Sequence, residues 1–252
     1  MSAAPLHVGI VACSSEGAAL CYRTLCAEGA ARLGPHAHPE ISLHTHSLAD
    51  YVTCLDRADL AGVGALMLSS ADKLARAGAD FLICPDNTIH QALGHVLPQS
   101  PLPWLHIAEE VAAEARARGY RRIGILGTRW LVDSNVYPDK LEAQGLQWLR
   151  PSEEDRDTLA RVIMDELVYG VFKPESVARL QAVIARLREA GCDAVVLGGG
   201  CLHDRLLAAA LHAGLPAHGF KVLGARSLSP GDAGLSLGQA WVALHQLTDK
   251  DT

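Results

Sequence analysis

Short apolar runs alternate with amphipathic stretches along this chain, and this alternation limits its fold more than any other feature. In the first part of the sequence, strands are expected at residues 7–12 ("HVGIVA"), 41–47 ("ISLHTHS") and 79–85 ("ADFLICP"). Helices are expected from Glu16 to Cys26 and from Asp59 to Ala77, where apolar residues recur at helical spacing. Strands that alternate with helices of this length predict βαβ units and a parallel sheet.

The pattern restarts after a proline-rich break at residues 98–104, "PQSPLPW". Beyond it we expect a helix, a strand, two helices and a strand, at residues 111–120, 121–128, 157–172, 176–191 and 192–200. We therefore divide the chain into an N-terminal α/β domain, a second α/β domain, and a C-terminal segment that returns to the first domain as a helix. These three parts are expected at residues 1–105, 106–225 and 226–252.

The second half also resembles the first. "HVGIVACSS" (7–15) corresponds to "RIGILGTRW" (122–130), and "LARAGADFLICPDNTIH" (74–90) to "LREAGCDAVVLGGGCLH" (187–203). Because both pairs keep their order and nearly their spacing, they indicate an internal duplication, which would place two strand-end turns face to face across a cleft. The alternative is that any two βα units look alike, since glycine before an apolar strand is common.

Composition and charge exclude several classes of partner. The chain has 252 residues, 49% of them apolar, and a formal net charge of −6 without clusters of Lys and Arg. This balance argues against nucleic acid and against an anionic membrane surface as partners. The N-terminus lacks the basic region of a signal peptide, and no apolar run is long enough to span a bilayer. We therefore expect a cytoplasmic protein.

Cysteine and histidine usage predicts neither a disulfide framework nor a metal site. The seven cysteines are odd in number and contain no CxxC pair, so most of them are expected to be buried thiols. The twelve histidines include two tight pairs, His36 with His38 and His44 with His46. His44 and His46 are expected to face the same way on a strand, but no third ligand accompanies them at a recognisable spacing.

Several long blocks resemble the aspartate/glutamate racemase family, which comprises cofactor-independent amino-acid racemases. They are residues 56–90, residues 117–151 and "DELVYGVFKPES" (165–176), and the similarity runs from about His7 to at least His203. The resemblance implies two doubly wound parallel-sheet α/β domains related by a pseudo-twofold, with the substrate bound in the cleft between them. It also implies that no cofactor such as PLP is used, and that the chain forms a homodimer.

The resemblance places an aspartate where the family has a catalytic thiol. In the family, one cysteine removes the α-proton and a second cysteine protonates the opposite face, because inversion needs an acid/base group on each side. The first cysteine stands in a Cys-Asn-Thr-x-His turn, which reads here as "DNTIH", residues 86–90. Asp86 therefore occupies its position. Cys84 lies two residues earlier, roughly 6–7 Å along the strand, and is expected to be core.

The second catalytic position has two readings. The family turn reads approximately Leu-Gly-Cys-Thr-Glu, whereas this chain has "LGGGCLHD". Counted without a gap, Gly199 takes the cysteine position. A two-residue insertion in the glycine run instead makes Cys201 the thiol and puts His203 where the glutamate would be.

Other positions match residues that hold the substrate in the family. Ser14, Ser15 and Glu16 open the first expected helix, where a substrate carboxylate could dock; the alternative is a simple N-cap. The remaining matches are Asn87, Thr88, Thr128 and Lys173. Asn87 and Thr88 could instead form only an Asx turn, and Lys173 could be a solvated surface residue.

One departure concerns the substrate side chain. Aspartate-specific family members carry an arginine after the second strand, whereas this chain has Tyr51 near that place. Loss of a bidentate carboxylate clamp removes the main reason to expect an acidic amino acid.

These features support three hypotheses. With Asp86 and Cys201 on opposite faces, the protein is a racemase or isomerase of an amino acid or related small carboxylic acid. With Gly199 at the second position, it is a relative with a changed reaction, such as a lyase, decarboxylase or hydrolase. The third hypothesis is a non-catalytic paralogue that binds a small acid.

Overall fold

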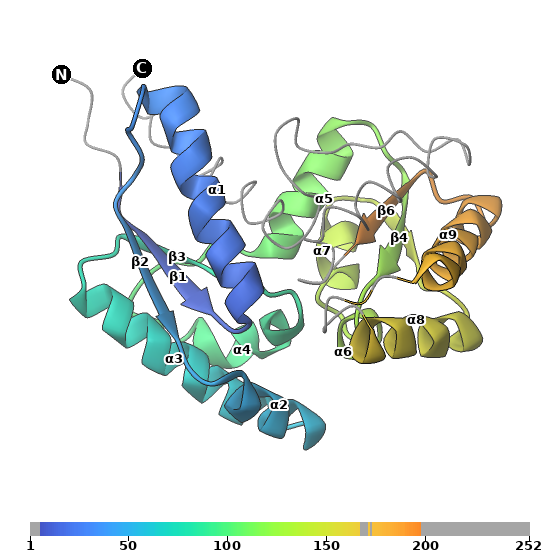
Figure 1. Cartoon of the computed structure of the whole chain (residues 1–252), viewed down its shortest axis with the longest axis horizontal. Helices are drawn as coiled ribbons and strands as arrows, with labels where there is room; N and C mark the ends of the chain where they lie inside the picture. The colour runs from blue at the N-terminus through green and yellow to red at the C-terminus, as the bar shows by residue number, and fades with distance from the viewer. Residues whose placement is uncertain (1–5, 167–170, 172, 198–252) are drawn as a thin grey trace. The chain divides into compact units, whose positions relative to one another are not determined.

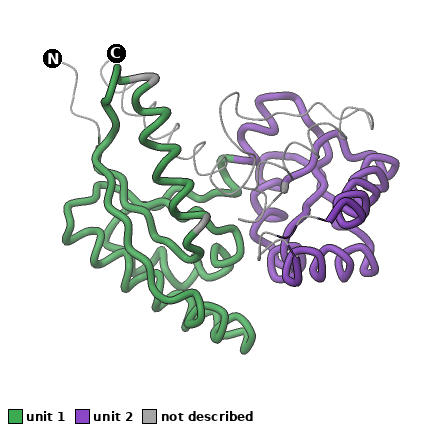
Figure 2. Tube along the Cα trace, viewed as in Figure 1, with its two compact units in different colours: residues 1–110, 233–252 green, residues 111–232 purple. Residues whose placement is uncertain are grey.

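The structure is a computed structural model that describes residues 6–166, 171 and 173–197. These residues fall into two compact units, unit 1 up to residue 110 and unit 2 from residue 111 (Figure 2). Each unit is an α/β domain built on a parallel sheet. The segment expected at 226–252 lies outside the described residues, and the expected domain limits remain predictions.

Unit 1 is built on a sheet of three parallel strands. They are β1 (Val8–Ala12), β2 (Ile41–Thr45) and β3 (Phe81–Ile83), in the order β2-β1-β3. The central strand β1 is completely buried, as its uninterrupted apolar sequence predicts for a strand covered on both faces. In a parallel sheet all the carboxyl ends lie at one edge, so the turns after β1 and β3 are neighbours.

Helices cover both faces of this sheet (Figure 1). On one face, β1 packs through Val8 and Ile10 against Cys21 and Leu25 of α1 (Ser15–Leu33). On the other face, Val11 packs with residues of α2 (Leu48–Asp56) and α3 (Leu60–Arg76). Successive side chains of a strand point to opposite faces, which explains this division. The short helices η1 (Thr88–Ala92) and α4 (Leu93–Val96) follow β3.

Unit 2 repeats the strand order of unit 1. Its strands are β4 (Arg122–Leu126), β5 (Gln147–Leu149) and β6 (Ala194–Leu197), in the parallel order β5-β4-β6. The helix α5 (Ile107–Ala117) precedes β4. The remaining helices are α6 (Arg129–Val132), α7 (Pro138–Ala143), α8 (Glu153–Asp165) and α9 (Pro174–Glu189).

Each central strand contains a glycine at a place where a side chain would meet a neighbouring leucine. A Cβ at Gly9 would lie 2.6 Å from a methyl of Leu82, and a Cβ at Gly124 would lie 2.9 Å from a methyl of Leu187. At both positions a larger residue would force the leucine methyl to shift, so glycine lets the leucine pack closely against the sheet. The two glycines stand at matching places in "HVGIVA" and "RIGIL", in agreement with the internal repeat.

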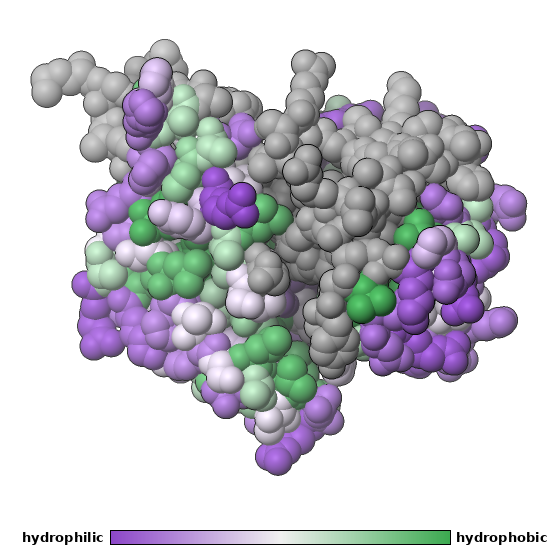
Figure 3. All heavy atoms as spheres, in the orientation of Figure 1, coloured by the Kyte–Doolittle hydropathy of each residue, from purple (hydrophilic) through white to green (hydrophobic). Residues whose placement is uncertain are grey.

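The helices α8 and α9 are joined by an ion pair. Both guanidinium nitrogens that face Asp155 contact its carboxylate, with Arg186 Nε 2.9 Å from Oδ2. This contact holds the pKa of Asp155 below its ordinary value. Hydrophilic residues gather on the outer surface over these two helices (Figure 3).

Several expected element boundaries were wrong. α1 extends to Leu33 rather than Cys26, and α5 begins at Ile107 rather than at residue 111. α8 begins at Glu153 rather than at residue 157, because the Ser152 hydroxyl accepts a hydrogen bond from the Asp155 N–H and caps the helix. The helices α2, α6 and α7 and the strand β5 were not expected.

Within the part of the chain that the structure describes, no helix combines the length and the apolar character that a membrane span requires.

Candidate active site

The candidate site lies at the carboxyl edge of the unit 1 sheet. The pairing of β1 with β3 matches Gly9 with Leu82 and Ile10 with Ile83. Continued by three residues, this register brings Cys13 level with Asp86. The turn that carries Asp86 and the start of α1 therefore meet beside each other.

Asp86 is held by the backbone of the turn that follows it. Its Oδ1 accepts hydrogen bonds from the N–H groups of Thr88 (2.9 Å) and Ile89 (3.2 Å), which open η1. This is the arrangement of an Asx turn that caps a helix. The two donors fix the position of the carboxylate, and they would equally favour any other anionic group at the same place.

The buried side chain of His90 holds the same turn through two hydrogen bonds. Its Nδ1 lies 2.6 Å from the carbonyl oxygen of Asp86, and its Nε2 lies 3.3 Å from the N–H of Ile107. Since Nε2 accepts from this N–H, the ring proton is on Nδ1 and is donated to Asp86. Burial, and secondarily His106, lowers the pKa of His90 to about 3, so the ring is neutral near pH 7.

Opposing effects act on the pKa of the Asp86 carboxyl. Burial raises its pKa above the ordinary value, whereas hydrogen bonds from the two backbone N–H groups and from the Cys13 thiol act in the opposite direction. The burial effect is the largest, so the carboxyl holds its proton more tightly than a solvated aspartate does.

Cys13 is a component that sequence reasoning missed. It is buried at 4% exposure, and its thiol hydrogen-bonds the Asp86 carboxyl. In the sequence it looked like one more core thiol. The usable signal was its place immediately after a strand whose neighbour ends in the Asp86 turn. Cys84 is core as expected, completely buried, with its sulfur 3.8 Å from the backbone oxygen of Asp86.

Tyr51, on α2, lies near Cys13, Cys84 and Asp86 at this edge of the sheet. It is completely buried. Its hydroxyl has no hydrogen bond of good geometry within the described part of the chain, although the Ser70 hydroxyl is close to it. Burial raises the pKa of Tyr51, and the nearby Cys84, Cys13 and Asp86 add to that rise. The phenol therefore faces the same strand ends as Asp86.

The other expected residues of unit 1 belong to the segments that follow β1 and β3. Ser14 is the N-cap of α1 and forms no capping hydrogen bond through its side chain, and Ser15 is exposed. The side chain of Glu16 is outside the description. Asn87 is buried at the start of η1, and Thr88 is partly buried.

In unit 2 the expected residues occupy two places. Thr128 follows β4 and caps α6, where its hydroxyl accepts a 3.3 Å hydrogen bond from the Leu131 N–H. Lys173 is exposed before α9, and its Nζ lies 3.1 Å from a carboxylate oxygen of Glu166. Gly199, Cys201 and His203 lie outside the described residues.

The comparison with protein families decides the family. The sequence model of the Asp/Glu/hydantoin racemase family matches residues 10–227, which is most of the chain. The chain belongs to the Asp/Glu/hydantoin racemase family. This confirms the resemblance drawn from the sequence blocks.

Solved structures of this family share the fold of the chain. A Yersinia pestis protein assigned as an Asp/Glu racemase superposes with a TM-score of 0.78 at 23% identity, over 95% of this chain and 99% of that one. An aspartate racemase homologue from Pyrococcus horikoshii gives a TM-score of 0.71 at 21% identity, over 96% and 99% of the two chains. At these identities the likeness establishes the fold.

The curated relatives match over shorter stretches. RacX of Bacillus subtilis, a broad specificity amino-acid racemase, is 24% identical over 123 residues, 49% of this chain and 51% of RacX. A carbamoyltransferase HypF homolog of Cupriavidus necator is 53% identical over 58 residues, 23% of this chain and 15% of that protein. The chain therefore spans about half or less of the length of these relatives.

Proposed function

We propose that this protein is a racemase-type isomerase that moves a proton at the α-carbon of an amino acid or a related small carboxylic acid. No cofactor takes part in the proposed reaction, and Asp86 is the acid/base group contributed by unit 1. The observation that carries the proposal is the environment of Asp86. Asp86 follows strand β3 and is held by two backbone N–H groups and a buried thiol. The sequence resemblance matches its position with that of the family's first catalytic cysteine.

The raised pKa of Asp86 suits this residue to proton transfer. A general base works best when its pKa lies nearer to the working pH than that of a solvated carboxylate does. In the proposed step the Asp86 carboxylate takes the α-proton and the electron pair remains on the substrate as a carbanion. The Cys13 thiol donates to the carboxylate before this transfer and holds it in place.

The substrate carboxylate is proposed to dock beside Asp86. Ser14 at the start of α1 has a hydroxyl that does not cap its own helix, and the first amides of that 19-residue helix favour an anion. Ser15, Glu16, Asn87 and Thr88 are proposed to complete this part of the site. From unit 2, Thr128 and Lys173 are proposed as contacts.

The substrate side chain is proposed to be neutral rather than acidic. Tyr51 stands near the place of the arginine that binds the distal carboxylate in aspartate-specific members. Its hydroxyl is buried and lacks a well-aligned partner among the described residues. The name of RacX, a broad specificity amino-acid racemase, supports a wide choice of substrate.

The group that acts on the opposite face of the substrate is proposed to come from the residues that follow β6. Cys201 is proposed as the second acid/base group, beside His203. If Gly199 takes the position instead, the alternatives are a lyase, decarboxylase or hydrolase, or a paralogue that binds a small acid without turnover. A cytoplasmic homodimer completes the proposal.

The deciding experiment is α-proton exchange in deuterated solvent, followed by NMR across a panel of amino acids and small hydroxy acids. We expect exchange with at least one neutral amino acid, and its loss by at least a hundredfold in Asp86→Ala. Asp56→Ala, which removes an exposed carboxylate from α2, is the matched control and should exchange like the wild type. No exchange with any compound tested would refute the isomerase proposal.

A second measurement separates the two readings of the second turn. If the wild type exchanges the α-proton with inversion and Cys201→Ala exchanges it with retention, Cys201 is supported as the group on the opposite face. If Cys201→Ala inverts as fast as the wild type, Cys201 has no such role. Release of a new product instead of exchange would favour the changed-reaction alternative.

A further inference from the structure

A polar cluster lies between α3 and the carboxyl end of β2 in unit 1. The side chains of Ser42, His44 and His46 point toward one face of the sheet, because they alternate along the strand and its continuation. His44 Nδ1 lies 3.0 Å from Ser70 Oγ, and His46 Nε2 lies 3.2 Å from Ser69 Oγ. The two rings meet edge to face with centroids 4.9 Å apart.

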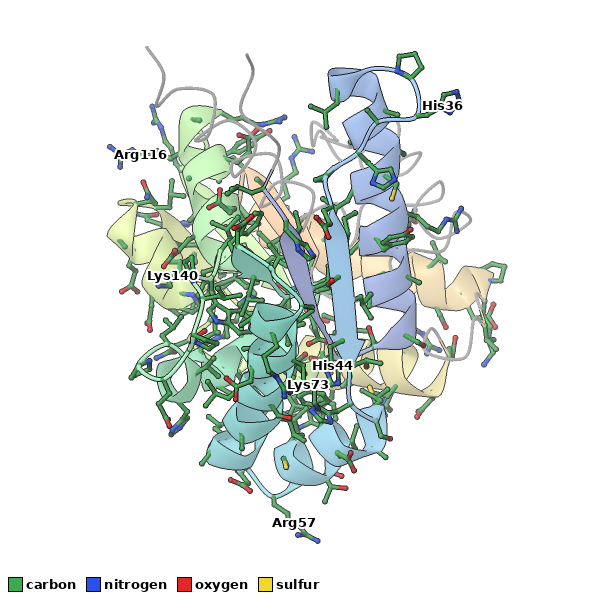
Figure 4. The ribbon with its side chains drawn as sticks, turned by 90° about the vertical axis from the view of Figure 1, so that its left-hand side faces the viewer. His36, His44, Arg57, Lys73, Arg116 and Lys140 are labelled. Carbon is green, nitrogen blue, oxygen red and sulfur yellow. The ribbon has the colours of Figure 1, made fainter. Side chains whose placement is uncertain are left out.

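Lys73 completes this cluster from the next turn of α3. Its Nζ lies 3.2 Å from Ser69 Oγ, the same hydroxyl that contacts His46. Figure 4 shows Lys73 and His44 side by side, whereas Arg57 points away at the far end of α2. We call His44, His46, Ser69, Ser70 and Lys73 the His44 cluster.

The hydrogen bonds determine which ring nitrogens are left to meet a ligand. The Lys73 ammonium can only donate, so Ser69 Oγ accepts from it, and the same hydroxyl is hydrogen-bonded to His46 Nε2. The ring nitrogen of His46 that remains to meet a ligand is therefore Nδ1. In His44 the hydrogen bond to Ser70 uses Nδ1, so Nε2 remains. The cluster thus presents an ammonium and two imidazole rings, each of which donates to an anion when its remaining nitrogen carries a proton.

The ammonium of Lys73 gives this cluster a positive charge. No carboxylate of the described residues lies within 4 Å of Lys73 Nζ. Burial and the charge of Lys73 lower the pKa values of both histidines, and Asp50 acts on His46 in the opposite direction, less strongly than Lys73. Near pH 7 the histidines are therefore neutral, while the ammonium repels metal cations and attracts anions.

We propose that His44, His46 and Lys73 form a binding site for a phosphate-type oxyanion, built from side chains that the proposed proton transfer at Asp86 does not use. All three groups are partly exposed, so a small solute reaches them without unfolding. A phosphate has more oxygens than a carboxylate and, near pH 7.5, more negative charge, so one ammonium and two imidazoles favour it over a carboxylate. This inference does not depend on the proposed isomerase activity.

The test is an NMR titration of the full chain with inorganic phosphate at pH 7.5 and constant ionic strength. We expect saturable shifts of the His44 and His46 imidazole signals, and a rise of both imidazole pKa values when phosphate is bound. The signal of the buried His90 serves as the internal reference and should not move. Lys73→Gln should weaken binding at least tenfold. Arg57→Gln, which removes an exposed positive charge from the same unit, should bind like the wild type.

Four outcomes would overturn the proposal. They are an absence of saturation, an equal loss of affinity in Arg57→Gln, acetate binding as tightly as phosphate in a parallel titration, and capture of Zn²⁺ by the two histidines without a phosphate response. A dispersed spectrum of Lys73→Gln identical to that of the wild type outside the cluster shows that the variant is folded. His44→Gln, which removes an imidazole and keeps Lys73, should also lose phosphate binding.

Discussion

His90 Nδ1 donates a 2.6 Å hydrogen bond to the backbone carbonyl of Asp86, while its Nε2 accepts from the Ile107 N–H. A protonated ring could not accept from Ile107, so both bonds together require a neutral imidazole. The conformation of the turn that carries Asp86 is therefore linked to the protonation state of one buried histidine.

This link predicts a specific acid sensitivity. Burial lowers the pKa of His90 to about 3 in the folded chain, below the value of about 6.5 in an unfolded chain. The stabilisation is therefore complete above pH 6.5 and is lost as the pH falls toward 3, at up to about 1.4 kcal/mol per pH unit. Urea unfolding at pH 7, 6, 5 and 4 should show a shallower pH dependence in His90→Gln than in the wild type. Equal slopes would refute the role of His90.

Asp86 should make the fold less stable at neutral pH. Its pKa is raised on folding, so the stabilisation it provides is present at low pH and is lost as the pH rises through the folded-state value. Asp86→Asn keeps an oxygen acceptor for Thr88 and Ile89 but removes the charge. We expect its melting temperature to exceed that of the wild type by about 2–5 °C at pH 8. The difference should shrink toward pH 4, and a lower melting temperature at pH 8 would contradict this account. Asp56→Asn is the control.

The thiol of Cys13 should tune the acidity of Asp86. Because it donates to the carboxylate, its removal in Cys13→Ala should raise the pKa of Asp86 further. Cys13→Ser retains a donor and should leave the pKa near that of the wild type. Carbon-13 NMR titration of the Asp86 carboxyl measures both variants directly. A fall of the pKa in Cys13→Ala would exclude the hydrogen bond.

The hydroxyl of Tyr51 contributes little to stability in this structure. It is buried without a well-aligned partner in the described residues, so Tyr51→Phe removes a desolvated polar group and keeps the ring. We expect the free energy of unfolding to stay the same or to rise by about 1 kcal/mol. A loss larger than this in urea titrations would mean that the hydroxyl is firmly bonded, with Ser70 the nearest candidate.

The sequence predicted five of the six parallel strands because each of them is a compact apolar run between turn residues. The strand β5 was missed because it has only three residues, none of them fully buried. The start of α8 was missed because its first turn is acidic and exposed, and only the cap at Ser152 marks it. α2 was missed because it is a nine-residue helix between a strand and a longer helix.

The candidate site was predictable in part. Asp86, Asn87 and Thr88 stand in one short turn, so a family resemblance locates them. Cys13 is distant from that turn in sequence, and only the pairing of β1 with β3 brings the two together. The choice between Gly199 and Cys201 depends on where a gap is placed in a run of three glycines, and apolar periodicity carries no information about it.

The groups that hydrogen-bond the Asp86 carboxyl within the described residues come from the N-terminal unit: two backbone amides and one thiol. The imidazole of His90, from the same unit, holds the turn through the Asp86 carbonyl. This part of the acidity of Asp86 is therefore established as that unit folds, before any small molecule arrives. Residues elsewhere in the chain can therefore change during evolution, and with them the substrate, while the pKa of this acid/base group is kept.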